Sequence, residues 1–400
     1  MKIALVTFDS LRVDHLSPYN HNLKFTSTIE KLSKRSYVFN HFATSNFTLP
    51  SVASILTSSY PLMFGGFRKG ISKRMNVAEI LSKNGFFTLA LHSNALITTR
   101  PGYTKGFAKC VDIRHDVGNS RMKIYLKYIL NDKVLAYARA EEVVERAVKE
   151  VRQLNKEKVF LWLHFMDNHH PYLPPAKFSE GMLTNPIKRA RALMLFKGYG
   201  RKEATKSEKK RKKIKKLYEL TVKYVDYVLG LLVEELGDDW IYIITSDHGD
   251  EFWEHGGESH QRKLYDELIR VPLIIHGVDK GKIDSLTDHT DIAPTILDIA
   301  GIKKPSVYIG ESVLNAEKEY IYAENYGIYA IRDKEYKVIL DENRKRVELY
   351  DLRRDPSEQV NLARDEPDIL KEYMLKLERH RKYIREFELK ASVKLVKLRL

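Results

Sequence analysis

Acidic and histidine residues end three widely separated apolar runs of this chain. The runs end in Asp9-Ser10, in Asp167-Asn168-His169-His170 and in Ser246-Asp247-His248. In open α/β sheets, ligands bind outside the carboxyl ends of the strands. If the three runs are strands, their polar ends therefore meet at one edge of a sheet. Carboxylate oxygens and imidazole nitrogens are ligands of divalent metals, so the pattern predicts a metal site.

A hydroxyl group stands just before a segment that is typical of a helix start. Thr48 lies two residues before Pro50, and both residue types favour the first turn of a helix, so Thr48 alone reads as a cap near that start. A bound cation can make a hydroxyl nucleophilic by stabilising its alkoxide. A helix N-terminus also favours an incoming anion. Beside a metal site, Thr48 is therefore a candidate nucleophile.

Three histidines lie in segments expected to be loops at the same edge of the sheet. They are His169, His255 and His260. A single loop histidine usually has no special role. Three near a candidate metal site could donate hydrogen bonds to a leaving group or to anionic substrate oxygens.

The elements that must position these residues alternate between strand and helix. Predicted strands are 3–8, 37–42, 86–91, 159–165, 240–245 and 271–275, and predicted helices are 26–35, 50–57, 77–82, 139–154, 209–236 and 291–300. Such alternation indicates an α/β fold with a largely parallel sheet. We therefore expect one large α/β domain, residues 1–317, to carry the site.

The pattern changes near residue 318. Short predicted strands follow at 319–323, 327–331, 336–340 and 347–350, and a predicted helix spans 366–388. This order predicts a small α+β subdomain with an antiparallel sheet, residues 318–390. The basic and apolar tail, 391–400, could be a strand, an oligomer contact or a surface anchor.

Composition limits the class of protein. The chain has 400 residues and one cysteine, Cys110, so no disulfide can form within it. We expect a soluble protein of a reducing, cytoplasmic compartment. No apolar run is long enough for a transmembrane helix, although peripheral membrane contact stays open. The oligomeric state is unknown at this stage.

The net charge of +15 is concentrated in the stretch 188–216. A solvated helical face is the first interpretation of this stretch. A rim for an anionic substrate or a membrane-surface patch is the second. Nucleic acid is an unlikely partner, because no nucleic-acid-binding module accompanies the lysines.

Several segments together resemble the sulfatase family of the alkaline phosphatase superfamily. They include Phe8-Asp9-Ser10, Thr48-Leu49-Pro50-Ser51, Asp167-Asn168-His169-His170-Pro171 and Asp247-His248-Gly249, with further matches at 264–273, 291–297 and 348–362. The resemblance implies an alkaline-phosphatase-like three-layer α/β/α sandwich. Its central sheet would be mixed and largely parallel, with a small C-terminal α+β subdomain.

The resemblance also implies roles for individual residues. Asp9, Thr48, Asp247 and His248 match the positions that hold the family's divalent metal, and Thr48 matches the nucleophile. His169 matches a histidine that assists the leaving group. His260 matches the position that binds the transferred anionic group. The pocket would be lined further by Arg12, His255 and Lys69.

The chain departs from the dedicated sulfatases at two places. Those enzymes resemble Cys-x-Pro-Ser-Arg at the nucleophile, where the cysteine becomes formylglycine; here Thr48 replaces that cysteine, so no formylglycine is expected. Ser10 replaces a second aspartate, and with His248 this favours Mn or Zn over Ca or Mg. The family's two-metal members carry a histidine four residues after a further aspartate; here Pro171 stands four residues after Asp167, which favours one metal ion.

The sequence thus predicts a metal-dependent hydrolase of anionic esters. Threonine nucleophiles in the superfamily are associated with phosphoryl chemistry, so a phosphate monoester, diester or phosphonate is favoured over a sulfate ester. One alternative is a phosphotransferase that passes a phospho-headgroup to a glycan or lipid. Another is a non-catalytic, basic, polyanion-binding protein. The substrate itself, a small anionic ester or a glycan or lipid, is not identified by the sequence.

Overall fold

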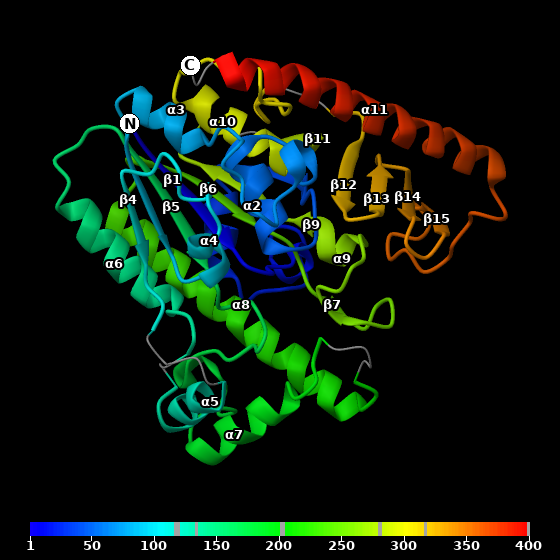
Figure 1. Ribbon diagram of the computed structural model, residues 1–400. Helices are drawn as coiled ribbons and strands as arrows, with labels where there is room; N and C mark the ends of the chain where they lie inside the picture. Colours follow the sequence, from blue (N-terminus) through cyan, green and yellow to red (C-terminus); the bar gives the residue numbers. More distant parts are fainter. Residues whose placement is uncertain (116–120, 133–134, 201–204, 279–281, 316–317, 398–400) are drawn as a thin grey trace.

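The computed structural model describes residues 1–115, 121–132, 135–200, 205–278, 282–315 and 318–397. A mixed sheet forms its centre (Figure 1). Its strands are β1 (Lys2–Phe8), β2 (Ser36–Phe42), β3 (Phe87–His92), β4 (Lys109–Asp112), β5 (Val159–Phe165), β6 (Trp240–Ser246), β9 (Arg270–Val271), β10 (Leu273–His276) and β11 (Lys282–Asp288). Their order is β11-β2-β10-β6-β1-β5-β3-β4, with β9 beside β2.

Strand β1 lies in the middle of this sheet and runs parallel to both of its neighbours. Phe8 lies opposite Phe165 of β5 and opposite Ser246 of β6. Only β9 and β10 among the described strands of this sheet run antiparallel to their partners. The carboxyl ends of β1, β5 and β6 therefore lie at one level and at one edge.

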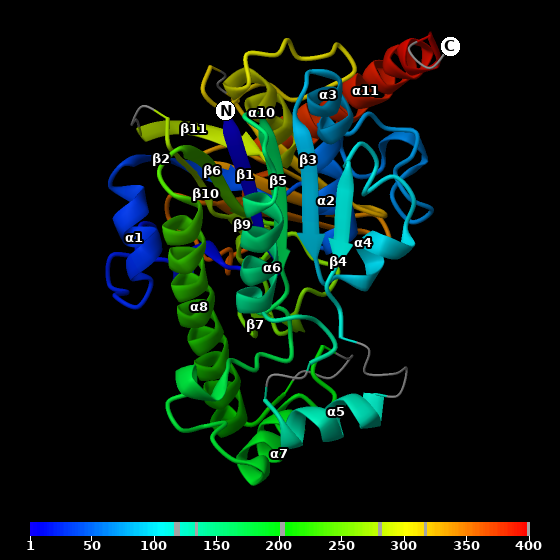
Figure 2. The same ribbon diagram turned by 90° about the vertical axis from the view of Figure 1, so that its left-hand side faces the viewer.

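Helices cover both faces of the sheet, as Figures 1 and 2 show. One face packs on α1 (Ser27–Ser33), α6 (Ala140–Arg152) and α8 (Glu208–Leu236), and the other on α2 (Thr48–Thr57), α3 (Val77–Lys83) and α10 (Ile292–Ile299). Residues of β1 alternate between the two cores: Ala4 and Val6 join the first, Ile3 and Leu5 the second. A strand buried on both faces must be apolar throughout, which is why the continuous apolar runs of the sequence predicted the central strands. The predicted three-layer sandwich is confirmed.

The C-terminal part forms the predicted antiparallel sheet. Its strands are β12 (Ile321–Asn325), β13 (Ile328–Arg332), β14 (Tyr336–Asp341) and β15 (Arg346–Asp351), paired in chain order. The long helix α11 (Pro367–Lys397) packs against β13 and β14. The predicted domain boundary at 317 lies outside the described residues.

The expectation of a separate tail at 391–400 is wrong for the residues that the structure describes. Helix α11 continues to Lys397, beyond its predicted end at 388. Ala391 and Leu395 are buried in the apolar core beneath α10. Apolar burial against the large domain therefore extends the helix. Residues 398–400 lie outside the described residues.

Further described elements complete the fold. They are α4 (Ala95–Thr99), α5 (Arg121–Leu130), α7 (Pro186–Leu195), α9 (Asp266–Ile269) and the two-stranded ribbon of β7 (Glu251–Phe252) and β8 (Glu258–Ser259). The predicted strand 271–275 is divided by Pro272, which cannot donate to a strand ladder. Within the described residues, no helix has both the length and the apolar character required to cross a bilayer.

Candidate functional site

Two buried carboxylates leave adjacent strands at the centre of the sheet. The backbone amide of Asp9 donates to the Phe165 carbonyl at 2.8 Å, and that of Asp247 donates to the Phe8 carbonyl at 3.0 Å. These bonds continue the strand ladders by one residue. Asp9 and Asp247 are both fully buried. The sheet register thus places two acidic groups side by side away from bulk water.

Ser10 joins the two carboxylates. Its amide donates to Oδ1 of Asp247 at 3.0 Å, and its hydroxyl donates to Oδ1 of Asp9 at 2.9 Å. Its φ of 61° lies in the left-handed region, which is uncommon for a residue with a side chain. Ser10 therefore orients both carboxylates.

Thr48 is the first residue of α2, and its hydroxyl points to these carboxylates. Oγ1 lies 3.2 Å from Oδ2 of Asp9 and 3.4 Å from Nε2 of His248. The structure corrects the interpretation of Thr48 as a helix cap: Phe47 occupies the N-cap position, and no side chain caps the helix there. The Thr48 hydroxyl is therefore directed to the cluster and not to the helix backbone.

His248 presents one ring nitrogen to the cluster. Its Nδ1 lies 2.8 Å from the Gly249 carbonyl, which can only accept a hydrogen bond. Nδ1 therefore carries the proton, and Nε2 has a free lone pair. Nε2 lies 3.6 Å from Oδ2 of Asp247 and 3.9 Å from Oδ1 of Asp9. A backbone carbonyl that fixes the tautomer in this way is common behind metal-binding histidines.

The donor set fits a divalent cation. Ligand atoms of Asp9, Asp247 and His248 all lie within 4.8 Å of one another. Oδ2 of Asp247 is buried and accepts no hydrogen bond from any described residue. Burial and the nearby charge of Asp9 raise the pKa of Asp247 to about 8. Burial would also raise the pKa of Asp9, but His169, His164 and His248 lower it overall. A cation between the carboxylates would remove their repulsion.

His260 lies beside His248 and is held by a buried carboxylate. Its Nδ1 lies 2.7 Å from Oδ1 of Asp250, and the Tyr172 hydroxyl donates to Oδ2 of Asp250 at 2.5 Å. Although burial opposes ionisation, His260 and its histidine neighbours lower the pKa of Asp250. The rings of His260 and His248 have centroids 4.6 Å apart. A fixed negative charge therefore supports His260 at the site.

His169 also lies beside His260. The centroids of these two rings are 5.3 Å apart. Nδ1 of His169 donates to the His170 carbonyl at 2.6 Å, which leaves Nε2 as the nitrogen that can exchange a proton. The rings of His169 and His170 stack with their centroids 4.4 Å apart. Asp9, Thr48, His169, Asp247, His248 and His260 thus form one group, the site cluster.

Arg12 and Lys69 do not join the site cluster through any described contact. The Arg12 guanidinium donates to both oxygens of Asp14 and to Glu254, each bond being 2.8 to 2.9 Å long. Burial opposes its charge, but Asp14 and Glu254 raise the pKa of Arg12. Lys69 is exposed in the loop after α2. The Arg12 charge is therefore already balanced within the protein.

His255 lies in a separate network. Its Nδ1 is 2.7 Å from Glu267, its Nε2 is 2.9 Å from the Glu358 carbonyl, and its ring stacks on Tyr265. Burial would lower the pKa of His255, but the Glu267 hydrogen bond raises it. Both ring nitrogens are occupied, so the structure gives His255 a role in joining the C-terminal subdomain to the large domain.

Two further residues near the site cluster were absent from the predicted set. His164 is fully buried in β5, with Nε2 3.8 Å from Oδ2 of Asp9. Asp250 supports His260. A lone histidine in the apolar run 159–165 was a signal for His164, and the acidic residue two positions after His248 was a signal for Asp250.

Asp167, which ends the second apolar run, has a structural partner instead. It accepts a hydrogen bond of 2.9 Å from the amide of Ala140 at the start of α6.

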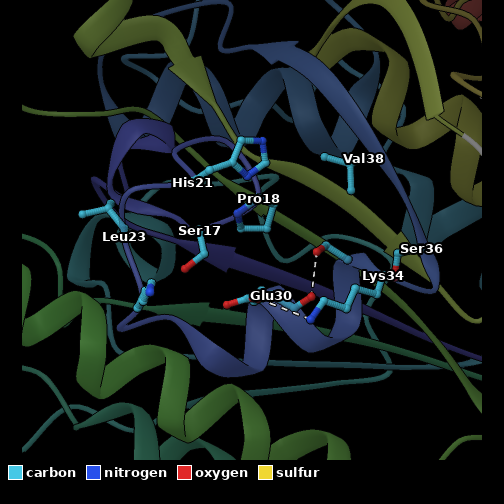
Figure 3. A pocket seen from close by; sticks show the side chains of 10 residues that line it. Ser17, Pro18, His21, Leu23, Glu30, Lys34, Ser36 and Val38 are labelled. Atoms are coloured by element: carbon cyan, nitrogen blue, oxygen red, sulfur yellow. Dashed lines mark hydrogen bonds and ion pairs between the residues drawn. The ribbon is translucent and has the colours of Figure 1, made fainter.

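A pocket of about 530 Å³ lies elsewhere, between residues 17–24, α1 and β2. Figure 3 shows its lining, with an ion pair of 3.3 Å between Glu30 and Lys34 at its edge. None of the predicted site residues lines it. Glu30 and Lys34 are an exposed pair one helical turn apart, a kind that contributes little to stability. The chemistry-bearing residues are therefore at the sheet edge and not in this pocket.

Comparison with known families matches most of the chain. The sequence model of the family "Sulfatase" matches residues 2–302. A second model, "N-sulphoglucosamine sulphohydrolase, C-terminal", matches residues 254–383. The two matches together cover the large domain and most of the C-terminal part.

Curated relatives include an uncharacterized sulfatase, YidJ, of Escherichia coli, 29% identical over 36% of this chain and 32% of that protein. A hexuronate-2-O-sulfatase of Bacteroides thetaiotaomicron is 32% identical over 36% of this chain and 34% of its own length. These alignments span about a third of the relatives. An arylsulfatase of Clostridium perfringens is 25% identical over 91% of this chain and 90% of its own length.

Solved structures show the same fold at low sequence identity. One holds its substrate D-glucosamine-2-N,6-O-disulfate; it is 20% identical, covers 96% of this chain and 98% of its own, and has a TM-score of 0.78. A phosphonate monoester hydrolase of Silicibacter pomeroyi is 17% identical over 96% and 95%, with a TM-score of 0.73. The fold is therefore shared by proteins described as acting on sulfate and on phosphonate esters.

Proposed function

The chain belongs to the sulfatase family, and on that premise we propose that it is a metal-dependent ester hydrolase with Thr48 as its nucleophile. The position of the Thr48 hydroxyl carries this proposal. It lies between Asp9 and His248, at the start of a helix, and Thr48 is 8% exposed. A hydroxyl at that place can be activated and can reach a substrate from outside.

The residues of the cluster can carry out the two halves of an ester hydrolysis. The Thr48 hydroxyl gives up its proton along its hydrogen bond to Asp9 as its oxygen attacks phosphorus. The bond from phosphorus to the leaving oxygen breaks, and His169 protonates that oxygen. Water then attacks phosphorus and gives a proton back to His169, the bond from phosphorus to the Thr48 oxygen breaks, and that oxygen recovers its proton from Asp9, so that the acid is released and the Thr48 hydroxyl is restored.

His260, positioned by Asp250, stabilises the negative charge of the transferred group. His260 faces the same cluster and can donate to the anionic oxygens of the transferred group. Asp250 does not touch the substrate in this scheme: it positions His260 through the 2.7 Å contact at Nδ1. A carboxylate behind a histidine fixes both the ring orientation and the nitrogen that carries the proton.

Asp9, Thr48, Asp247 and His248 would hold the divalent ion. When bound, it supplies Lewis-acid stabilisation of the Thr48 oxygen and of a substrate oxygen. The mixed oxygen and nitrogen donor set favours Mn or Zn over Ca or Mg.

We favour a phosphate or phosphonate ester over a sulfate ester. The family's modified cysteine is replaced by Thr48, and a phosphonate monoester hydrolase shares the fold over almost the whole chain. The sulfated-sugar enzymes among the neighbours keep sulfate as the competing substrate class. A transferase would use the same phosphothreonine and pass the group to an alcohol.

The deciding experiment measures turnover of p-nitrophenyl phosphate, bis(p-nitrophenyl) phosphate, p-nitrophenyl phenylphosphonate and p-nitrophenyl sulfate with added Mn, Zn, Mg or Ca. Thr48→Ala should lower kcat/KM for the preferred ester by about a thousandfold or more. Thr48→Ser is the matched control, because it keeps a hydroxyl at the same place and should retain measurable turnover.

The outcomes separate the alternatives. Phospho-ester turnover lost in Thr48→Ala, with a phosphorylated Thr48 detected by mass spectrometry after rapid quenching, supports the proposal. A clear preference for the sulfate ester would overturn the choice of substrate. Product formation that rises with added glycerol points to a transferase. No turnover by metal-loaded, folded protein would contradict the hydrolase proposal.

A further inference from the structure

Helices α5 and α7 expose apolar side chains that no described element covers. The exposed fractions are 66% for Met122, 54% for Leu126, 76% for Leu130, 66% for Ile187 and 69% for Met194. We call the outer faces of these two helices the α5–α7 surface. Soluble proteins rarely gather exposed large apolar residues on adjacent elements unless that surface binds something.

The exposed residues of α5 form one stripe. Met122, Leu126 and Leu130 recur every fourth residue, and at about 3.6 residues per turn they lie on one side of the helix. Tyr128 is fully buried and lies on the opposite side of that helix. The helix is therefore anchored by one face and presents an apolar ridge on the other.

Helix α7 repeats this arrangement. Ile187 and Met194 are seven residues apart and share one side, whereas Arg189 and Ala192 are buried. Arg189 donates to the carbonyls of Ile129 and Leu130 at 2.8 and 3.2 Å, at the end of α5. These bonds join the two helices into one unit.

The charged residues of the two helices have one sign. Neither α5 nor α7 contains an aspartate or a glutamate. Exposed basic residues on or directly after these helices are Lys123, Lys127, Lys188, Arg191 and Lys197. An apolar ridge on helices whose own charged residues are all basic is complementary to a surface that is apolar inside and anionic outside.

The position of the two joined helices also suits contact with a surface of that kind. In Figures 1 and 2, α5 and α7 lie side by side and project beyond the body of the molecule. They do so on the side of the sheet where β1, β3 and β5 end, which is the side of the site cluster (Figure 2). A surface in contact with this unit would face the edge of the sheet that carries the site.

We propose that the α5–α7 surface binds peripherally to anionic lipid bilayers. The apolar ridges enter the interface between headgroups and acyl chains, and the basic side chains contact the anionic headgroups. Long basic side chains can reach headgroups while their stems lie along apolar surface. This inference goes beyond the proposed function and does not depend on the chemistry at Thr48.

The test is cosedimentation of the full chain with vesicles of phosphatidylcholine alone and of phosphatidylcholine mixed with phosphatidylglycerol. We expect binding to the mixed vesicles that weakens as salt is raised. The triple variant Met122→Gln/Leu126→Gln/Leu130→Gln should lower the partition coefficient by at least about tenfold. Its matched control is Leu375→Gln/Leu389→Gln, two exposed leucines of α11, 45% and 71% exposed, which should leave binding unchanged.

Loss in the α5 variant alone supports the proposal. No binding of the wild type to phosphatidylglycerol vesicles, or equal loss in the α11 control, would overturn it. If the wild type does not bind vesicles but self-associates with rising concentration, and the α5 variant does not, the bilayer proposal is wrong. The α5–α7 surface would then bind a second copy of this chain. If the triple variant fails to fold, the single substitutions Leu130→Gln and Met194→Gln test the same ridges separately.

Discussion

At the scale of single residues, Asp247 gives the strongest indication that the site binds a cation. Its Oδ2 is buried and accepts no hydrogen bond from a described residue, and Asp9 lies next to it. Two adjacent buried carboxylates repel each other unless a proton or a cation neutralises them. The metal-free protein should therefore be less stable than the metal-loaded one.

Removing the Asp247 carboxylate should change how stability depends on the metal. Asp247→Asn should make the metal-free protein more stable, because folding no longer has to protonate this acid against its usual pKa or bury its charge beside Asp9. Added Mn or Zn should stabilise the wild type by about 2.7 kcal/mol at a hundred times its Kd, and the variant by much less. Thermal unfolding with and without metal, together with metal content, measures both effects.

Asp226 offers the matched control. It is also a buried aspartate, but its two oxygens accept from the amides of Thr28 and Ile29 at 3.0 and 2.8 Å. Burial raises its pKa to about 6, yet it lies in α8 away from the site cluster. Asp226→Asn should keep the full metal response. An equal loss of response in both variants would argue against a cation at Asp247.

Some site residues could be predicted from the sequence because they are fixed by local chain direction. Asp9 and Asp247 directly follow strands in register, so their meeting needs only the parallel order of β1 and β6. His255 differs, because its partners Glu267 and Glu358 approach it from other segments. Pairing of this kind depends on tertiary packing, which no spacing in the sequence records.

At the scale of elements, the position of α2 depends on the segment that follows it. Arg74 is fully buried and donates to Ser59 Oγ and to the carbonyls of residues 60, 61, 63 and 66 at 2.7 to 3.3 Å. Burial lowers its pKa to about 10, so it still carries its charge at neutral pH. One guanidinium therefore binds five acceptors in the first part of the loop behind α2.

Replacing Arg74 should loosen this loop and weaken the fold. Arg74→Met removes all five hydrogen bonds and leaves buried acceptors without donors, so the free energy of unfolding should fall by about 3 kcal/mol. Urea unfolding measures the change. Lys73→Met changes an exposed neighbour of the same charge and should alter stability by less than about 0.5 kcal/mol. Equal effects would mean that charge, and not hydrogen bonding, matters here.

The elements themselves were predictable to different degrees. The central strands have continuous apolar runs, and α6 has a clear amphipathic pattern, so both stand out. Helices α5 and α7 were not predicted. Several of their large apolar residues are exposed and others are buried, so neither helix has a single apolar stripe that would identify it in the sequence.

At the scale of the whole molecule, α11 joins the two parts of the fold. Near its middle, Leu377 and Ile384 pack in the apolar cluster of the C-terminal sheet. At its end, Ala391 and Leu395 enter the core that lies beneath α2, α3 and α10. One helix that is buried in both cores should make them unfold together.

This coupling can be tested because the three tryptophans, Trp162, Trp240 and Trp253, all lie in the large domain. Leu395→Asp buries a charge at the end of α11 and should lower the free energy of unfolding by about 3 kcal/mol. Tryptophan fluorescence and far-ultraviolet circular dichroism should then report one transition at lower urea. Val393→Asp, at a position 59% exposed, should shift neither signal. If Leu395→Asp only frays the helix end, the fluorescence transition stays in place, and the two parts of the molecule are then independent folding units.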